Sequence, residues 1–320
     1  MGVRAGAQAL SMLAVPLNVH VLTALEEGPK PLIDLRRAVG SPPQTTMRGH
    51  LRALTEVGVL ERHRRNDFPG PVDYRLARPG NELLAVAEIL QRWLAASPEG
   101  PLPLGTVAAK SAIKALVDGW SSNIVRALAA RPLSLTELNR LISGINYPSL
   151  ERRLGAMRLA GQIEARPGQS RGTPYAATDW LRQAIAPIAV AARWEREHAA
   201  TKTSAIGRID TEAVFLLAVP LLRLAGDLSG SCRLAVEVPN GGGDFNLAGV
   251  LVGVREGHIA SCVSRLEGDA GAWASGSASA WLGAVIEQDT DRLEVGGDCE
   301  LATAILDGLH GALFGARQRI

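Results

Sequence analysis

The stretch from Ser134 to Glu164, SLTELNRLISGINYPSLERRLGAMRLAGQIE, carries the breaks and spacings of two short helices followed by a strand. Ser134 and Glu137 stand three residues apart, which is the spacing of a capping box, so a helix is expected to begin there. Ser143-Gly144 interrupts this helix, and Pro148-Ser149 opens the next one near its first turn. We therefore expect two helices joined by a tight turn.

The apolar residues of this stretch recur at helical spacing. The first helix has an expected inward stripe of Leu135, Leu138 and Leu141, and the second has one of Leu150, Leu154 and Met157. The arginines of the second helix are left for solvent or a partner. Gly161 ends that helix, and an alternating strand follows. Helix, turn, Arg-bearing helix and hairpin together form the outline of a winged helix-turn-helix module.

The same framework occurs earlier in the chain. A shift of 103 positions lays residues 21–61 on residues 124–164 without a gap. Leucines, a proline and the breaker glycines coincide, whereas exposed positions differ: Arg48 falls on Glu151 and Arg52 on Gly155. A duplicated fold must keep its apolar scaffold and can vary its surface. The sequence therefore predicts two copies of one module that do not read identical targets.

Charge is distributed unevenly along the 320 residues. The net charge of +2 hides a value of +9 for residues 1–203 and −7 for residues 204–320, and 30 of the 34 basic residues are Arg. A basic region that holds both copies fits a polyanionic partner, and Arg suits phosphate and guanine contacts. The alternative is a solvated basic face with no partner.

Other functional classes find little support in the composition. Cys232, Cys262 and Cys299 lack metal-ligand spacing, and reduced thiols in a cytoplasmic protein are the expectation. No apolar run approaches the roughly 20 residues that cross a bilayer. The six His residues match neither a metal site nor a catalytic triad, and the Gly clusters are not phosphate loops. We expect no catalytic residues, no metal, no cofactor and no membrane association.

In the first copy, residues 31–39 form the expected first helix, residues 44–57 the recognition helix, and residues 59–63 and 72–76 the strands of a basic wing. In the second copy, the recognition helix spans residues 148–160. A recognition helix contacts base edges in the major groove, and a basic wing contacts the phosphate backbone. The predicted DNA-binding residues are Gln44, Thr45, Arg48, Arg52, Arg62, Arg64, Arg65, Tyr147, Ser149, Arg152, Arg153, Arg158 and Arg171.

The second copy resembles the HxlR family of bacterial winged-helix transcription regulators. The resemblance rests on Gly119-Trp120, LSLTEL at 133–138, ISGI at 142–145 and GQIE at 161–164. It implies binding of operator double-stranded DNA as a dimer, with a response to small electrophiles or metabolites, sometimes through an N-terminal Cys. Neither copy has that Cys, and the tandem arrangement departs from the usual single module. One chain could therefore imitate the dimer, or the chain could form a homodimer.

Residues 204–320 differ in character, with an apolar segment over 211–228, strand-like runs over 232–238, 247–254 and 259–266, an expected helix over 272–285, and a final helix capped by Asp298. This order resembles the sterol carrier protein fold, a mixed sheet whose helices cover an apolar tunnel. The resemblance implies a pocket for a hydrophobic small-molecule effector. The alternative is packed core. The predicted lining is Phe215, Leu216, Trp273, Trp281, Leu282 and Val285.

The predicted fold class is α+β, with winged helix domains at 1–98 and 105–203 and a sterol-carrier-like domain at 204–320. The leading functional hypothesis is a ligand-responsive DNA-binding transcription regulator. A second hypothesis is a sequestering or resistance protein for a natural product or lipid, in which the winged helix domains form the binding groove. An enzyme acting on a bound metabolite ranks third. Steep weakening of binding by salt would separate the first from the others.

Overall fold

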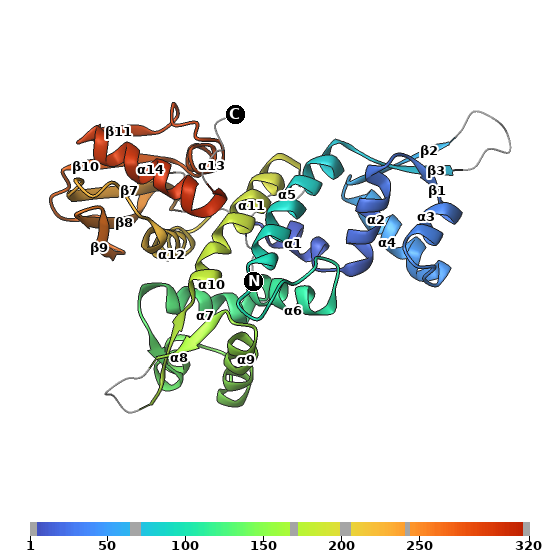
Figure 1. Ribbon diagram of the computed structural model, residues 1–320, viewed down its shortest axis with the longest axis horizontal. Helices are drawn as coiled ribbons and strands as arrows, with labels where there is room; N and C mark the ends of the chain where they lie inside the picture. The colour runs from blue at the N-terminus through green and yellow to red at the C-terminus, as the bar shows by residue number, and fades with distance from the viewer. Residues whose placement is uncertain (1–4, 65–71, 167–171, 199–205, 241–243, 316–320) are drawn as a thin grey trace. The chain divides into compact units, whose positions relative to one another are not determined.

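The computed structural model describes residues 5–64, 72–166, 172–198, 206–240 and 244–315. Two compact units are present in the chain: Met1–Val117 with Val190–Ser204, and Asp118–Ala189 with Ala205–Ile320. The three domain boundaries expected from the sequence stay a prediction. The predicted mixed α+β class is confirmed by the helices and strands of both units (Figure 1).

The first unit is built from helices around a three-stranded antiparallel sheet in the order β1-β3-β2. Pro16 opens the second helix, where its missing N–H costs nothing. The elements are α1 (Ala7–Leu13), α2 (Pro16–Glu26), β1 (Lys30–Pro31), α3 (Leu32–Ala38), α4 (Gln44–Glu56), β2 (Leu60–Arg64), β3 (Val72–Leu76), α5 (Arg78–Ala95), α6 (Val107–Val117) and the end of α11 (Ile185–His198).

The second unit begins with a similar series of elements. Its first sheet has the order β4-β6-β5, again antiparallel. The capping box expected at Ser134 is confirmed, because the Ser134 hydroxyl accepts from the Glu137 amide and the Glu137 carboxylate accepts from the Ser134 amide. The elements are α7 (Gly119–Ala130), β4 (Leu133–Ser134), α8 (Leu135–Leu141), α9 (Tyr147–Leu159), β5 (Ile163–Ala165), β6 (Pro174–Ala177), α10 (Asp179–Gln183) and the start of α11.

The two helices predicted to be recognition helices, α4 and α9, end in the same way. Gly58 after α4 and Gly161 after α9 have φ values of 75° and 72°, a left-handed conformation that favours glycine. The next amide in each case, Val59 N or Gln162 N, donates back to Leu54 O at 3.0 Å or to Met157 O at 2.9 Å. This is a Schellman motif, and it turns each helix directly into a strand.

The remainder of the second unit is a five-stranded mixed sheet in the order β11-β10-β7-β8-β9, in which only β10 and β7 pair in parallel. Helix α12 packs against both α7 and β8. The elements are α12 (Arg208–Ala218), the 3₁₀ turn η1 (Val219–Leu221), β7 (Gly230–Pro239), β8 (Phe245–Arg255), β9 (His258–Val263), β10 (Ala272–Ser277), α13 (Ala278–Glu287), β11 (Glu294–Gly297) and α14 (Cys299–Phe314).

The helix predicted over residues 272–285 is wrong in its first half. Ala272–Ser277 is strand β10, and the helix begins only after Ser277, whose hydroxyl accepts from the Ala280 amide as N-cap. Ala272 and Ala274 favour a helix by intrinsic propensity, but this segment pairs with β7 and β11, and that pairing gives it strand geometry. The N-cap role predicted for Asp298 is confirmed, since its carboxylate accepts from the Leu301 amide.

Three other segments have boundaries or exposures worth noting. After β6 the chain forms two helices, α10 and α11, that are separated at Ala184, and Pro187 lies in the first turn of α11, where a proline is tolerated. The apolar segment 211–228 is helical only to Ala218, and its end is exposed. Leu141, expected to face inward, is 63% exposed at the end of α8.

Candidate nucleic-acid interface

A groove of about 670 Å³ lies in the first unit between the recognition helix α4 and the wing strands β2 and β3. The end of β1 and the start of α3 complete its wall. Its lining combines basic and apolar side chains: Pro31, Leu32, Ile33, Gln44, Arg48, Arg52, Thr55, Glu56, Arg62, Val72 and Tyr74.

Helix α4 directs a polar stripe into this groove because its apolar stripe is used by the core. Met47, Leu51 and Leu54 are buried, as predicted. Gln44, Arg48 and Arg52 stand four residues apart, so they share the opposite face of the helix, and all three are exposed. Thr45 is also exposed on this helix. Four predicted DNA-binding residues therefore lie on one accessible face.

The arginines of the groove differ in their partners. Arg52 donates to Glu56 at 2.7 Å, one helical turn away, and this carboxylate raises the pKa of Arg52. The Arg62 guanidinium lies 6.0 Å from the centre of the Tyr74 ring, its cross-strand neighbour. Among the residues that the structure describes, Arg48 has no ion-pair partner. Among the groove arginines that the structure describes, Arg48 and Arg62 therefore have no ion pair to break before they contact an external anion, whereas Arg52 does.

The wing is described only in part. Arg64 is the last residue of β2, and Arg65 lies outside the described residues, as does Arg171 in the second wing. The strands of the two hairpins pair in the same way apart from their length: Leu60 pairs with Leu76, and Ile163, 103 positions after Leu60, pairs with Ala177, 101 positions after Leu76, so the second hairpin is two residues shorter.

Helix α9 presents a different surface. Tyr147 is 46% exposed at its start, where the Asn146 side chain caps the helix by accepting from the Ser149 amide at 2.9 Å. Ser149 is half-buried, and Arg152 and Arg158 are exposed. The predicted residues of α9 are therefore accessible, with one exception.

That exception is Arg153, which forms an ion pair with Asp118 and donates to the Ser121 hydroxyl at 3.3 Å. Asp118 is the N-cap of α7 and Ser121 lies in its first turn, so Arg153 holds α9 to α7. The 103-residue shift places Arg153 on His50 and Ser121 on Asn18, and His50 Nδ1 lies 2.8 Å from Asn18 Oδ1. A contact between equivalent positions of two helices thus occurs in both units. The 103-residue repeat could therefore have predicted that Arg153 faces α7.

Tyr74, Ile33 and Val72 line the groove without having been predicted. The hairpin register could have identified Tyr74, because a residue directly opposite Arg62 shares its face of the sheet. Ile33, which is 70% exposed at the start of α3, gave no such signal, since an apolar helix residue is ordinarily expected in the core.

The predicted effector-binding residues do not all gather in one place. Phe215 and Trp281 are buried and pack edge to face, with ring centroids 4.9 Å apart, and the Trp281 indole donates to Ala235 O at 2.7 Å. Trp273 instead lies over Gly296, where an added Cβ would come within 2.5 Å of its ring. Leu216 is buried, and Leu282 and Val285 are half-buried.

No single helix among the described residues is long and apolar enough to span a bilayer. Helices α1 and α2 together have the length and composition for such a span, but the chain bends by 83° between them.

Comparisons with known proteins point to the first module. Residues 17–99 match the family described as HxlR-like helix-turn-helix. A search of curated proteins gave no match. Among solved structures, the chain is similar to a protein from Enterococcus faecalis V583 described as a transcriptional regulator of the MarR family, with 27% identity over 27% of this chain and 78% of the other, and a TM-score of 0.26. It is also similar to diamide-treated YodB from B. subtilis, with 27% identity over 27% of this chain and 85% of the other, and a TM-score of 0.26.

Proposed function

We propose that this protein is a transcription regulator that binds double-stranded DNA through tandem winged helix modules. The observation that carries the proposal is the exposed stripe of Gln44, Arg48 and Arg52 on a helix of the HxlR-like domain, facing a groove that also receives Arg62. In the proposed complex, α4 enters the major groove. Arg48 contacts a backbone phosphate, and the wing lies along the backbone.

The second module is proposed from the shared architecture. The element order, the sheet order, the Schellman motif and the strand pairing of residues 119–177 match those of residues 16–76. We propose that one chain thereby supplies two recognition helices, which contact successive turns of a duplex about 34 Å apart. A homodimer of this chain would supply four recognition helices.

We propose that residues 204–320 regulate the second module by binding a hydrophobic small molecule. Helix α12 supports this role because it contacts both the second module, through α7, and the five-stranded sheet, through β8. Asp210 at its start pairs with Arg126 of α7, and the Arg182 guanidinium of α10 donates to Leu216 O near its end at 2.9 Å. Its opposite face packs on β8. An effector that moves α12 would act on α7, to which Arg153 fastens α9.

The experiment is a fluorescence-anisotropy titration of the full chain with labelled duplex from upstream of its own gene. Wild type is compared with Arg48→Ala and with Arg265→Ala, which removes an exposed arginine between β9 and β10. We expect weaker binding only for Arg48→Ala. Equal binding by all three proteins would show that α4 is not part of the DNA interface. Absence of binding by wild type to any such duplex would contradict the proposed function.

The second candidate function, sequestration of a small molecule, is favoured by one observation. The groove volume of about 670 Å³ lies within the range of roughly 300–1,000 Å³ typical of small-molecule sites, and Leu32, Ile33 and Val72 supply apolar wall. Binding of an apolar ligand should resist salt, whereas binding of DNA through several phosphates should weaken steeply with it. This alternative would be favoured if wild type bound an apolar ligand but no DNA, and if the Ile33→Asp variant lost the binding of that ligand.

A further inference from the structure

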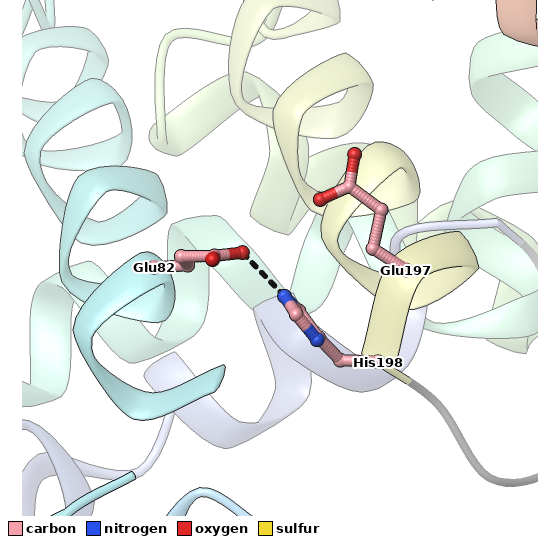
Figure 2. A group of neighbouring side chains, drawn as sticks. All are labelled: Glu82, Glu197 and His198. Carbon is pink, nitrogen blue, oxygen red and sulfur yellow. Dashed lines mark hydrogen bonds and ion pairs between the residues drawn. The ribbon is translucent and has the colours of Figure 1, made fainter. Parts of the chain in front are cut away.

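Three metal-binding side chains from two helices of the first unit meet near the end of α11 (Figure 2). Glu82 comes from α5, and Glu197 and His198 come from α11. One ligand atom of each lies within 4.8 Å of the others, and His198 Nε2 already bonds to the Glu82 carboxylate. We propose that this cluster binds a divalent transition-metal ion of the zinc class and thereby ties α5 to α11.

The ligand types match that class of ion. Zn²⁺ accepts imidazole nitrogen together with carboxylate oxygen, and three protein ligands leave a fourth position for water. The donor set contains no soft sulfur ligand, and it lacks the six or more oxygens that Ca²⁺ takes. The His198 side chain is 10% exposed, so the nitrogen ligand is partly shielded from competing water.

Other contacts of α11 hold the cluster in place. The Trp194 indole donates to Pro79 O, at the start of α5, at 2.8 Å, and its ring packs beside that of His198. The Glu195 carboxylate is buried and accepts from the amides of Gly6 and Ala9 at 2.7 and 2.9 Å. These bonds fix the end of α11 on α1 and α5 in advance, so binding orders few additional groups.

Each carboxylate is also held by an arginine. Arg78 donates to one oxygen of Glu82 at 2.8 Å, and Arg193 donates to one oxygen of Glu197 at 3.0 Å. The other oxygen of Glu82 faces His198. Such outer partners orient metal-ligating carboxylates, but their positive charge opposes a cation. The site should therefore bind metal more weakly than one without arginines, and replacing Arg78 by Gln should tighten it.

The competing explanation is a plain ion network, since two arginines already balance two glutamates around the imidazole. The two explanations differ in what His198 does. In a metal site the His198 imidazole is a ligand, so its removal lowers the affinity for the ion. A plain network has no requirement for an added ion.

The test is a calorimetric titration of the chelator-treated full chain with Zn²⁺ alone at neutral pH. We expect one ion per chain and at least a tenfold loss of affinity for His198→Ala and for Glu197→Gln. Glu197→Gln leaves the Glu82–His198 contact in place, so it guards against a folding defect. His258→Ala, which removes an exposed imidazole on β9, is the matched control and should bind as wild type does.

Absence of Zn²⁺ binding by wild type would overturn the proposal. Equal binding by wild type and His198→Ala would overturn it as well, because another imidazole would then be the ligand. These outcomes do not depend on whether the protein binds DNA.

Discussion

Helices α4 and α9 have the same framework and different surfaces. Each buries three apolar residues at the same spacing and ends in the same Schellman motif. At equivalent exposed positions, however, α4 has Arg48 and Arg52 where α9 has Glu151 and Gly155. The framework is set by burial and backbone geometry, whereas the surface is free to diverge. We infer that α4 contributes most of the electrostatic attraction to DNA and that α9 acts mainly through Tyr147, Arg152 and Arg158.

The two regions also differ in how their helices are capped. Ser134 and Asn146 cap α8 and α9 with their side chains, whereas prolines occupy the equivalent N-cap positions of α3 and α4 without a side-chain bond. Local hydrogen bonds thus contribute more to the second region. Helices α3 and α4 both pack against α2.

The largest expected effect is a loss of DNA affinity when an exposed arginine of α4 is replaced by the residue that α9 has at the equivalent position. Arg48→Glu gives α4 the residue that α9 has at the equivalent position. We expect a loss of more than about tenfold, because the phosphate contact of Arg48 is lost and a glutamate adds repulsion from phosphate. Anisotropy measures the loss. Glu151→Arg is the reciprocal variant and should strengthen binding; weaker binding by that variant would contradict the comparison.

The next effect concerns stability. Arg153→Ala removes the half-buried ion pair with Asp118, and we expect a loss of about 1–2 kcal/mol in the free energy of unfolding, since the pair is partly screened by water. Urea unfolding of the full chain measures it. Arg152→Ala, on the exposed side of the same helix, is the control and should change stability by less than about 0.5 kcal/mol. Equal losses would mean that Arg153 has no special role.

A smaller effect is expected at the capping box. Ser134→Ala should cost about 1 kcal/mol, the usual value for loss of a Ser N-cap. Pro31→Ala, at the equivalent position of α3, loses no side-chain bond and should cost less. Thermal unfolding of the two variants checks the difference. If both lost the same stability, the capping bond would contribute nothing measurable.

The capping box also predicts a pH dependence. Hydrogen bonds from the Ser134 amide and hydroxyl lower the pKa of Glu137 to about 2. A depressed carboxyl pKa stabilises the fold above the ordinary value of 4.5, and this contribution disappears as the pH falls through about 2. The stability difference between wild type and Glu137→Gln should therefore shrink below pH 4.5. A difference that is constant down to pH 2 would refute the assignment.

The smallest effect is expected from Arg52→Ala. Arg52 is already paired with Glu56 and fully accessible, so part of its charge is offset before DNA arrives. DNA affinity should fall less than for Arg48→Ala in the same anisotropy assay. A larger fall would show that the pair with Glu56 opens in the complex.

Much of this fold follows from local patterns in the sequence. The burial of Met47 and Leu51, the capping box at Ser134 and the cap at Asp298 were all predictable, because each depends on residues within one or two helical turns. Strand β10 was not predictable in this way. Its alanines and serines take strand geometry because they pair with β7 and β11, which are distant in sequence. The inward role of Arg153 depends likewise on Asp118, 35 residues away.

The sequence predicted the residues that α4 contributes to the candidate site, but not those that other elements contribute to the groove. Gln44, Arg48 and Arg52 follow from helical spacing alone. Ile33 and Val72 reach the groove only because β1 and β3 pair beside α4. The Glu82–His198 contact joins residues 116 positions apart and has no local signature.

The most direct measurement is the slope of log affinity against log salt concentration for wild type and Arg48→Ala on the same duplex. Each phosphate contact contributes about 0.9 to the slope for duplex DNA. A steep slope for wild type, reduced by about one contact in Arg48→Ala, is the predicted result. A flat slope for wild type, or one that Arg48→Ala leaves unchanged, would contradict the assignment of α4 as the DNA-binding helix.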